Sequence, residues 1–348
     1  MSAGYNPFAL RQPQASSTVE PVRVLAYGKP KTRKTWWAGT AAATHRVWLL
    51  DGENNTGILR MLPEADQARV NRIPLAGSPH VPALAMFCAA MFKVKSFVWH
   101  LGEQRIFDLA YLTEKHDDDW FIHVDTRRLT TDDVVIVDSW TKMCSDMGLN
   151  YAIDNSLDVF AGERGKKTAG GKNDAMDYFR FMDMALDAIL QALQSMPCHV
   201  VLIGHQQEYE VETKTPLGTK KLNKIQVISG SGKHSSKVPA YLSDVLYFTA
   251  NDDGKTTTIN TASEALRDGG GANVAPATHQ FPGWTFSDLL EETGKPPARS
   301  TDMLPIDRSP FYPLTGKEIR EHMAATKAST AKSTAAQTPA TTGIIRQR

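Results

Sequence analysis

The segment Val22-Arg-Val-Leu-Ala-Tyr-Gly-Lys-Pro-Lys-Thr-Arg-Lys-Thr35 sets the architecture expected for this 348-residue chain. Its short apolar run ends at Gly28, and a helical pattern begins at Lys34. A strand, a glycine-containing loop and a helix in this order form a phosphate-binding P-loop, because the N–H groups and the dipole at the start of a helix attract an anion. We therefore expect this segment to hold the phosphates of a nucleotide.

Each residue of this loop is a candidate contact for the phosphates. Lys34 is expected to neutralise phosphate oxygens, and Thr35 to offer its hydroxyl to the Mg²⁺ that accompanies a nucleoside triphosphate. Arg33 replaces the second glycine of the usual pattern, so it either adds a phosphate contact or crowds the loop. Trp36 and Trp37 are expected either to contact the nucleotide or to pack on the sheet. The expected nucleotide-binding residues are Gly28, Lys29, Pro30, Lys31, Thr32, Arg33, Lys34, Thr35 and Trp36. The alternative for the whole segment is a turn with solvated basic residues.

The composition is that of a soluble globular protein, with 41% apolar residues and a net charge of +1. So small a net charge draws the protein neither to nucleic acid nor to a membrane, and any such attraction must come from local patches. Cys88, Cys144 and Cys198 form no zinc or disulfide pattern, which indicates buried, reduced thiols. No apolar run approaches the length that spans a bilayer, so we expect a cytoplasmic protein without a membrane segment.

Three further apolar runs are expected to be buried strands of one sheet: His45–Asp51, Val134–Asp138 and His199–Gly204. Helical patterns alternate with them. This order predicts an α/β fold, with a mostly parallel twisted sheet and helices on both of its faces. A C-terminal antiparallel hairpin is expected across the Asp253–Gly254 turn. Residues 57–130 give only short and weak patterns of helices and strands.

One domain is expected to span residues 21–295. Residues 1–20 are polar and rich in Pro, Gln and Ser, and are expected to form a flexible arm. In residues 296–348 Pro, Thr, Ser and Ala dominate and the apolar periodicity fades. We expect this segment to be a tail that is largely disordered from about residue 324.

Asp138 ends a run of β-branched residues, Val134-Val-Ile-Val-Asp138. A carboxylate at the carboxyl end of a central parallel strand lies beside the P-loop and can hold Mg²⁺ directly or through water. Asp138 and Thr35 are therefore the expected metal partners. The alternative is that Asp138 caps the following helix, although Ser139 can serve as that cap.

The order of these motifs resembles the core of the RecA superfamily. It looks most like the bacteriophage-encoded RecA-like ATPases, the AAA-type phage nucleotide-binding family, over roughly residues 21–295. The resemblance implies a RecA-like P-loop core with ATP and Mg²⁺ as cofactors, and ATPase activity on DNA, expected to be single-stranded, in phage recombination, annealing or replication. It also implies a homo-oligomer (a ring or filament), a single-strand-binding protein as a further partner, and the host bacterial cytoplasm as the location.

The resemblance also implies roles for polar residues that follow the strands. Glu53 stands at the position of the glutamate that activates the attacking water, and Asp51 competes for this role. His205 or Gln206 matches the polar residue that senses the γ-phosphate. Such ATPases complete their site with a basic residue from a neighbouring subunit. The candidates for that residue are Lys233, Lys237 and Arg267.

Two basic loops are expected where RecA-like proteins carry their DNA contacts, at residues 155–174 and 207–224. Lysines and arginines among glycines can follow a phosphate backbone without reading its sequence. The candidate residues are Arg164, Lys166, Lys167 and Lys172 in the first loop, and Lys220, Lys221 and Lys224 in the second. Plain solvated loops are the alternative.

Three functions remain open on the sequence. The first is an ATPase that oligomerises on DNA. The second is a nucleotide-binding switch or assembly protein that hydrolyses ATP weakly, because Arg33 alters the loop. The third is a helicase or packaging motor, for which the sequence supplies no recognisable second motor domain or nuclease.

Overall fold

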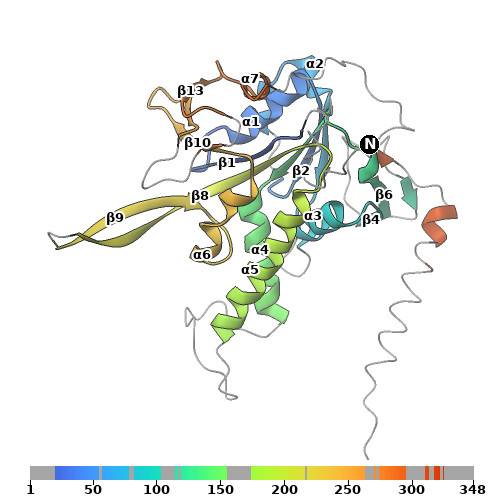
Figure 1. The fold of residues 1–348 in the computed structure, drawn as a ribbon. Coiled ribbons are helices and arrows are strands. Elements are labelled where there is room, and N and C mark those ends of the chain that lie inside the picture. The colour runs from blue at the N-terminus through green and yellow to red at the C-terminus, as the bar shows by residue number, and fades with distance from the viewer. Residues whose placement is uncertain are drawn as a thin grey trace, which may run out of the picture.

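A 10-stranded sheet forms the centre of the molecule (Figure 1). In the computed structural model the strands follow this order: β13 (Thr278–Phe281), β11 (Thr257–Asn260), β10 (Asp244–Ala250), β1 (Arg23–Gly28), β8 (His199–Thr215), β7 (Asp133–Asp138), β2 (Arg46–Asp51) and β3 (Val70–Pro74). In addition, β12 (Gly270–Gly271) pairs with β10 and β9 (Gly218–Val227) pairs with β8. All neighbours from β10 to β3 pair in parallel, so the expected mostly parallel sheet is confirmed.

The structure describes residues 20–54, 57–77, 82–102, 114–116, 119–154, 174–215, 218–262, 270–271, 274–294, 310–312, 317–321 and 324. The α-helices within these ranges are α1 (Lys34–Gly39), α2 (Glu64–Gln67), α3 (Ala83–Lys93), α4 (Trp140–Asp154), α5 (Asp174–Leu193), α6 (Gly232–Ser235) and α7 (Phe286–Glu292). The 3₁₀-helices are η1 (Thr40–Ala43), η2 (Gly57–Met61), η4 (Thr126–Arg128) and η5 (Val238–Tyr241). Among these residues no helix is both long and apolar enough to cross a bilayer.

Helices cover both faces of the sheet and produce two hydrophobic cores (Figure 1). Side chains of α3, α4 and α5 pack on one face, and those of α1, η1 and α7 on the other. Along β7, Val135 and Val137 enter the first core while Val134 and Ile136 enter the second. A strand buried on both faces therefore reads as a continuous apolar run, which is why the central strands were visible in the sequence.

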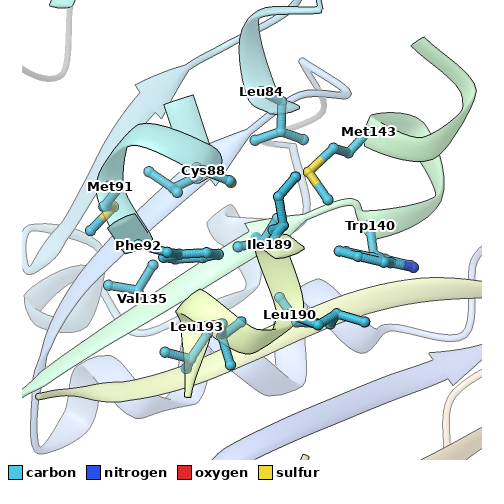
Figure 2. Close-up of a cluster of buried hydrophobic side chains, with 14 of the residues drawn as sticks. Leu84, Cys88, Met91, Phe92, Val135, Trp140, Met143, Ile189, Leu190 and Leu193 are labelled. Carbon is cyan, nitrogen blue, oxygen red and sulfur yellow. The ribbon is translucent and has the colours of Figure 1, made fainter. Parts of the chain in front are cut away.

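Figure 2 shows the larger core, in which α3 and α5 meet over the sheet. Leu84, Cys88, Met91 and Phe92 come from α3, and Ile189, Leu190 and Leu193 from α5. Trp140 and Met143 of α4 and Val135 of β7 complete the view. The first turn of α4 is thereby fixed against the sheet directly after Asp138, so the core positions the polar residues at this edge.

A second, smaller sheet of four antiparallel strands lies beside the first. It consists of β4 (Ser96–Gly102), β5 (Glu114–His116), β6 (Asp119–Asp125) and β14 (Phe311–Tyr312). β14 comes from the C-terminal segment, where Ile319 is fully buried in a small cluster with Phe121. The described part of residues 296–348 thus packs on this sheet. The expected disorder from about residue 324 lies outside the described residues, apart from residue 324 itself.

The expected basic loop at residues 207–224 is wrong. This stretch forms a long antiparallel ribbon, in which Gln206–Thr215 of β8 pair with Gly218–Val227 of β9. The ribbon projects from the core (Figure 1). Its Glu, Lys and Thr residues resemble a loop in composition, but Tyr209, Val211 and Thr213 alternate with charged residues at the period of a strand. The other basic loop, at residues 155–174, lies outside the described residues except for Asp174.

The expected C-terminal hairpin is confirmed. β10 and β11 pair as the antiparallel hairpin across the Asp253–Gly254 turn. The helical pattern that begins at Lys34 is divided into α1 and the 3₁₀-helix η1. This division leaves a short first helix directly behind the P-loop.

Candidate nucleotide-binding site

Strand alternation brings three polar side chains to one face of the sheet at its carboxyl edge. They are Asp51 of β2, Asp138 of β7 and His205 of β8, and each stands two positions after a residue of the core under α1. Because side chains two positions apart on a strand point to the same face, all three face the side on which α1 begins. The P-loop precedes α1, so this edge of the sheet faces the loop, and Asp138 contacts Thr35 directly.

The loop between β1 and α1 has the shape expected of a P-loop. Gly28 has a φ of 153°, and a Cβ at this position would lie 2.2 Å from the carbonyl oxygen of Phe248 on β10. Only glycine fits there. Lys31 and Arg33 have φ values of 64° and 63°, in the left-handed region. The chain therefore keeps the backbone conformation that a glycine at position 33 would favour.

Arg33 turns away from the loop. Its Nη1 donates to the Thr257 hydroxyl at 3.3 Å, and its Nη2 donates to the Gly254 carbonyl, both on the β10–β11 hairpin or its turn. The guanidinium therefore neither reaches into the loop as a phosphate contact nor crowds it. Both alternatives from the sequence are corrected, because the left-handed backbone aims this side chain outward.

Lys34 is 4% exposed and folds back into the loop. Its Nζ donates to the carbonyls of Lys29 at 2.8 Å and Gly28 at 3.2 Å, and to the Thr32 hydroxyl at 3.1 Å. Burial lowers the pKa of this ammonium to about 8, against the opposing effect of the nearby Asp138 and Glu53 carboxylates. These three acceptors are neutral. A phosphate group could accept hydrogen bonds from the same ammonium and would add a formal negative charge, which makes the hydrogen bonds stronger.

Asp138 lies directly against the start of α1. Its Oδ2 accepts a hydrogen bond from the Thr35 hydroxyl at 2.8 Å. Burial raises the pKa of this carboxyl to about 7, while the hydrogen bond from Thr35 acts in the opposite direction. The pair expected to hold a metal ion is thus assembled by segments far apart in the chain.

Ser139, and not Asp138, caps α4. The Ser139 hydroxyl accepts from the backbone N–H of Lys142 at 3.1 Å and donates to the Glu53 carboxylate. The peptide bond between Asp138 and Ser139 is cis. Because Ser139 caps α4, the Asp138 carboxylate is left to face Thr35, in agreement with the preferred sequence interpretation.

Glu53 follows β2 and lies between Ser139 and His205. Nε2 of His205 is 3.3 Å from Oε1 of Glu53, and both side chains are about a quarter exposed, at 25% and 28%. The hydrogen bond from His205 holds the pKa of Glu53 below its ordinary value, assisted by Ser139 and opposed by partial burial. The carboxylate is therefore charged, accessible and oriented, which are the properties of a group that can polarise a water molecule.

Asp51 is occupied elsewhere. Its Oδ1 accepts from the backbone N–H groups of Glu53 and Asn54, at 3.0 and 2.8 Å, and its Oδ2 pairs with Arg72 at 2.7 Å. The carboxylate is 1% exposed. These contacts leave Glu53 as the better placed of the two candidate bases.

Gln206 points to the opposite face of the sheet from His205, as strand alternation requires. Its amide oxygen accepts from the Tyr247 hydroxyl at 3.0 Å, and its amide nitrogen donates to Glu208 at 3.0 Å. His205 instead contacts Glu53 and is held by a hydrogen bond from its own N–H to the Thr141 hydroxyl, at 2.8 Å. The geometry favours His205 as the residue that responds to a phosphate.

Trp36 and Trp37 pack against the protein. Trp37 is fully buried and stacks on Trp284, with ring centroids 5.9 Å apart. Trp36 meets the edge of Phe281 at 4.6 Å. These contacts support the packing alternative for both side chains, and they fix α1 on the β13 side of the sheet.

Two of the three basic residues expected to act on a neighbouring subunit lie in the described part of the chain. Lys233 is exposed on α6, and the Lys237 ammonium lies 4.0 Å from Asp187 of α5. Arg267 is outside the described residues, as are Arg164, Lys166, Lys167 and Lys172. For Lys220 and Lys221 only the backbone of β9 is described.

Two residues that contribute to the site escaped the sequence analysis. Arg72 lies in β3 and reaches Asp51, and Thr141 lies in the first turn of α4 and reaches His205. An arginine inside a short strand next to apolar residues was a usable signal for Arg72, because such a charge needs a carboxylate partner. Thr141 gave no signal, because its contact depends on how α4 packs.

The residues present fit a magnesium ion. Thr35 and Asp138 offer hard oxygen donors, and Mg²⁺ is commonly held by one or two protein oxygens together with water and phosphate. In the part of the chain that is described, no group of three or more His, Cys, Asp or Glu side chains could hold a metal ion by itself. The site is therefore suited to a metal that arrives with a nucleotide.

The parallel sheet, the P-loop and the opposed carboxylate define the class of protein: an α/β P-loop ATPase that binds a nucleotide. The family model described as "AAA domain" matches residues 20–271. The chain belongs to this AAA domain family.

The chain shows distant similarity to solved structures. The chain is similar to the RadB recombinase with a TM-score of 0.37 and 12% identity, over 76% of this chain and 87% of the other. It is similar to an ATPase from the type III secretion system of pathogenic bacteria with a TM-score of 0.34 and 11% identity, over 72% and 64%. No curated protein matches the sequence significantly.

Proposed function

We propose that this ATPase is Mg²⁺-dependent, forms a homo-oligomer and acts on DNA, in its single-stranded form, during phage recombination, annealing or replication. The observation that carries the ATPase chemistry is the convergence of Lys34, Thr35, Asp138 and Glu53 at one edge of the sheet. We place the protein in the host bacterial cytoplasm, with a single-strand-binding protein as a further partner.

The side chains divide the chemistry of ATP hydrolysis among them. The loop N–H groups and Lys34 bind the phosphates, and Thr35 and Asp138 hold the metal, whose positive charge offsets the charge that develops on the phosphates. Glu53 orients the attacking water and accepts its proton. His205, which contacts Glu53, links the state of the γ-phosphate to β8.

Hydrolysis is tested with Lys34→Ala and Glu53→Gln. We expect Lys34→Ala to lose nucleotide binding and turnover together, since it removes the buried ammonium. Glu53→Gln should keep nucleotide binding and lose turnover by 10²-fold or more, a typical size for a lost catalytic base. Purified protein that neither binds nor hydrolyses a nucleoside triphosphate would rule out the proposal.

The ribbon offers one face for a nucleic-acid backbone. The register Tyr209↔Lys224, Val211↔Leu222 and Thr213↔Lys220 places these positions on one face, which carries no acidic residue. Glu208, Glu210, Glu212 and Lys221 occupy positions on the other face. An aromatic residue beside lysines suits single strands, because bases stack on the ring while lysines meet phosphates.

The register provides a matched test of DNA binding. Lys220→Ala with Lys224→Ala removes two charges from the first face, and Lys214→Ala with Lys221→Ala removes two from the other. We expect the first pair to weaken binding of a single-stranded oligonucleotide and to reduce the slope of log K against log salt by about 1 to 2. Equal effects of the two pairs would contradict recognition by this face.

The neighbouring-subunit role of Lys233, Lys237 and Arg267 also remains a proposal. Lys34 is the lysine whose ammonium folds into the P-loop. A basic residue from a second copy would supply further charge stabilisation during phosphoryl transfer. Turnover that rises with protein concentration, and that a charge-removing variant at one of the three positions abolishes, is the expected result.

The second candidate function is a nucleotide-dependent switch with weak hydrolysis. The observation that favours it is Arg33, which ties the P-loop to the β10–β11 hairpin. A switch would gain thermal stability from bound nucleotide by mass action, while turnover stayed at background. DNA-stimulated turnover is the result that separates the first function from this one.

A further inference from the structure

Arg72 and Asp51 form an ion pair directly beneath the turn that carries Glu53. Nη2 of Arg72 lies 2.7 Å from Oδ2 of Asp51, and Nε donates to the same oxygen at 2.8 Å. The Arg72 side chain is 17% exposed and the Asp51 side chain 2%. This pair is therefore largely shielded from solvent, where the geometry of an ion pair is held more firmly than on the surface.

The other oxygen of Asp51 closes the turn. Oδ1 accepts the N–H groups of Glu53 and Asn54, and the N–H of Gly52 donates to the carbonyl of Asp138 at 2.6 Å. Arg72 also donates to the side-chain oxygen of Asn54. Residues 52 to 54 are thus fixed by β3 on one side and by β7 on the other.

We propose that Arg72 is a positioning residue for hydrolysis, which orients the Asp51 carboxylate so that the turn holds Glu53 against Ser139 and His205. This inference rests on the proposed role of Glu53 in activating water. Arg72 reaches the turn through its contacts with Asp51 and Asn54, so its effect on Glu53 is transmitted through the Asp51 carboxylate and the backbone.

A matched ion pair lies at the other end of β2, the strand that carries Asp51. Nε and Nη2 of Arg46 donate to the two oxygens of Asp133, each at 2.9 Å, and the side chains are 8% and 0% exposed. This pair joins β2 to β7 at their amino ends, whereas Arg72 acts at the carboxyl edge. It therefore has similar chemistry and burial, without a connection to the turn of Glu53.

The test compares Arg72→Lys with Arg46→Lys. Both changes replace a forked donor by a point charge, so both should lower the free energy of unfolding. We expect Arg72→Lys to reduce kcat roughly tenfold while the affinity for a fluorescent ATP analogue with Mg²⁺ stays within about twofold, because misplacement of a catalytic group affects chemistry more than binding. Arg46→Lys should leave both kcat and affinity unchanged at a temperature where the variant is folded.

The pH profile gives a second readout that a purely structural role would not change. The hydrogen bond from His205 holds the pKa of Glu53 below its ordinary value. If Arg72→Lys loosens this contact, the pKa of Glu53 rises and the acidic limb of kcat moves to higher pH. The limb should stay in place in Arg46→Lys.

The outcomes separate the inference from the function on which it rests. If Glu53→Gln leaves kcat unchanged, the role of Glu53 in the proposed function fails. If Glu53→Gln abolishes turnover while Arg72→Lys matches Arg46→Lys in kcat and pH profile, the positioning role is overturned and the ATPase proposal stands.

A double variant covers the case in which Arg72→Lys does not fold. Asp51→Asn with Arg72→Gln removes both charges and keeps a side-chain oxygen that can accept the N–H groups of the turn. We expect a reduced kcat, because that oxygen is no longer held by the arginine. Wild-type kcat in this variant would overturn the inference.

Discussion

At the scale of single residues, Arg33 shows how a P-loop is built without its second glycine. A non-glycine residue in the left-handed region costs on the order of 1 kcal/mol. The hydrogen bonds from Arg33 to Gly254 and Thr257 hold the side chain on the outside of the loop and help to offset that cost. The replacement of glycine by Arg33 was visible in the sequence. The direction of the Arg33 side chain was not, because it depends on a hairpin more than 200 residues away.

Arg33→Gly is predicted to change turnover by less than about twofold, since the loop already has the backbone that glycine prefers. Thr257→Val is the companion variant, because it removes one partner of Arg33 and leaves the loop sequence intact. Steady-state turnover and the free energy of unfolding measure both variants. A large gain of turnover in Arg33→Gly would instead support the nucleotide switch.

The buried carboxyl of Asp138 predicts a pH-dependent stability. Its pKa is about 7 in the folded protein, compared with about 4 for an unfolded aspartate. Between these values the folded state binds more protons, so the contribution of Asp138 to the free energy of unfolding falls as the pH rises from about 4 to 7. Asp138→Asn should remove this part of the slope in denaturant titrations made without nucleotide. An unchanged slope would contradict the assignment.

His205 and Gln206 illustrate what the sequence could decide at this scale. Both come directly after the strand expected at His199–Gly204, and the resemblance left both as candidates. The strand period places adjacent side chains on opposite faces, and the packing of the helices then determines which face bears the P-loop. The choice between Asp51 and Glu53 also needed the structure, because the contacts that occupy Asp51, with Arg72 and with the N–H groups of the turn, form only in the fold.

At the scale of elements, the central strands were predictable and the ribbon was not. Burial on both faces gives a continuous apolar run, which is a strong signal in a single sequence. β8 begins as such a run and continues as a polar strand beyond Gln206, where it pairs with β9. Its composition there is typical of a loop, so the strand period was the one signal present.

Gly28→Ala is predicted to be severely destabilising. The added Cβ would lie 2.2 Å from a backbone oxygen of β10, which cannot move without breaking the pairing of β1 and β10. Strain of this kind is expected to cost about 3 kcal/mol or more. Gly57→Ala is the control, because nothing lies within 4 Å of a Cβ there, and its effect should stay within about 0.5 kcal/mol. Thermal unfolding distinguishes the two.

At the scale of the whole molecule, the mostly parallel sheet followed from the alternation of strands and helices, but the second sheet did not. Its strands come from residues 96–125 and from Phe311–Tyr312, which are far apart in the chain. Only two residues of β14 pair with β6, too few to give a pattern in the sequence. Composition marked the whole region from residue 296 as a tail.

Ile319 is predicted to anchor this C-terminal segment. It is fully buried beside Phe121, so Ile319→Ala should lower the free energy of unfolding by about 2 to 4 kcal/mol. Lys317→Ala is the matched control, since its side chain is 80% exposed and should change the stability little. Turnover of the folded fraction should be the same in both variants. Equal stability would show that the segment does not contribute to the fold.

The length of β8 has a mechanical consequence. It runs without a break from His199 to Thr215, and so includes both His205 at the phosphate edge and half of the projecting ribbon. A continuous strand transmits a displacement along its length, since its backbone is braced by hydrogen bonds to its neighbours. If His205 contacts the phosphate as proposed, loss of that phosphate would therefore tilt the projecting β8–β9 ribbon. A force on the ribbon would in turn act on the bound nucleotide.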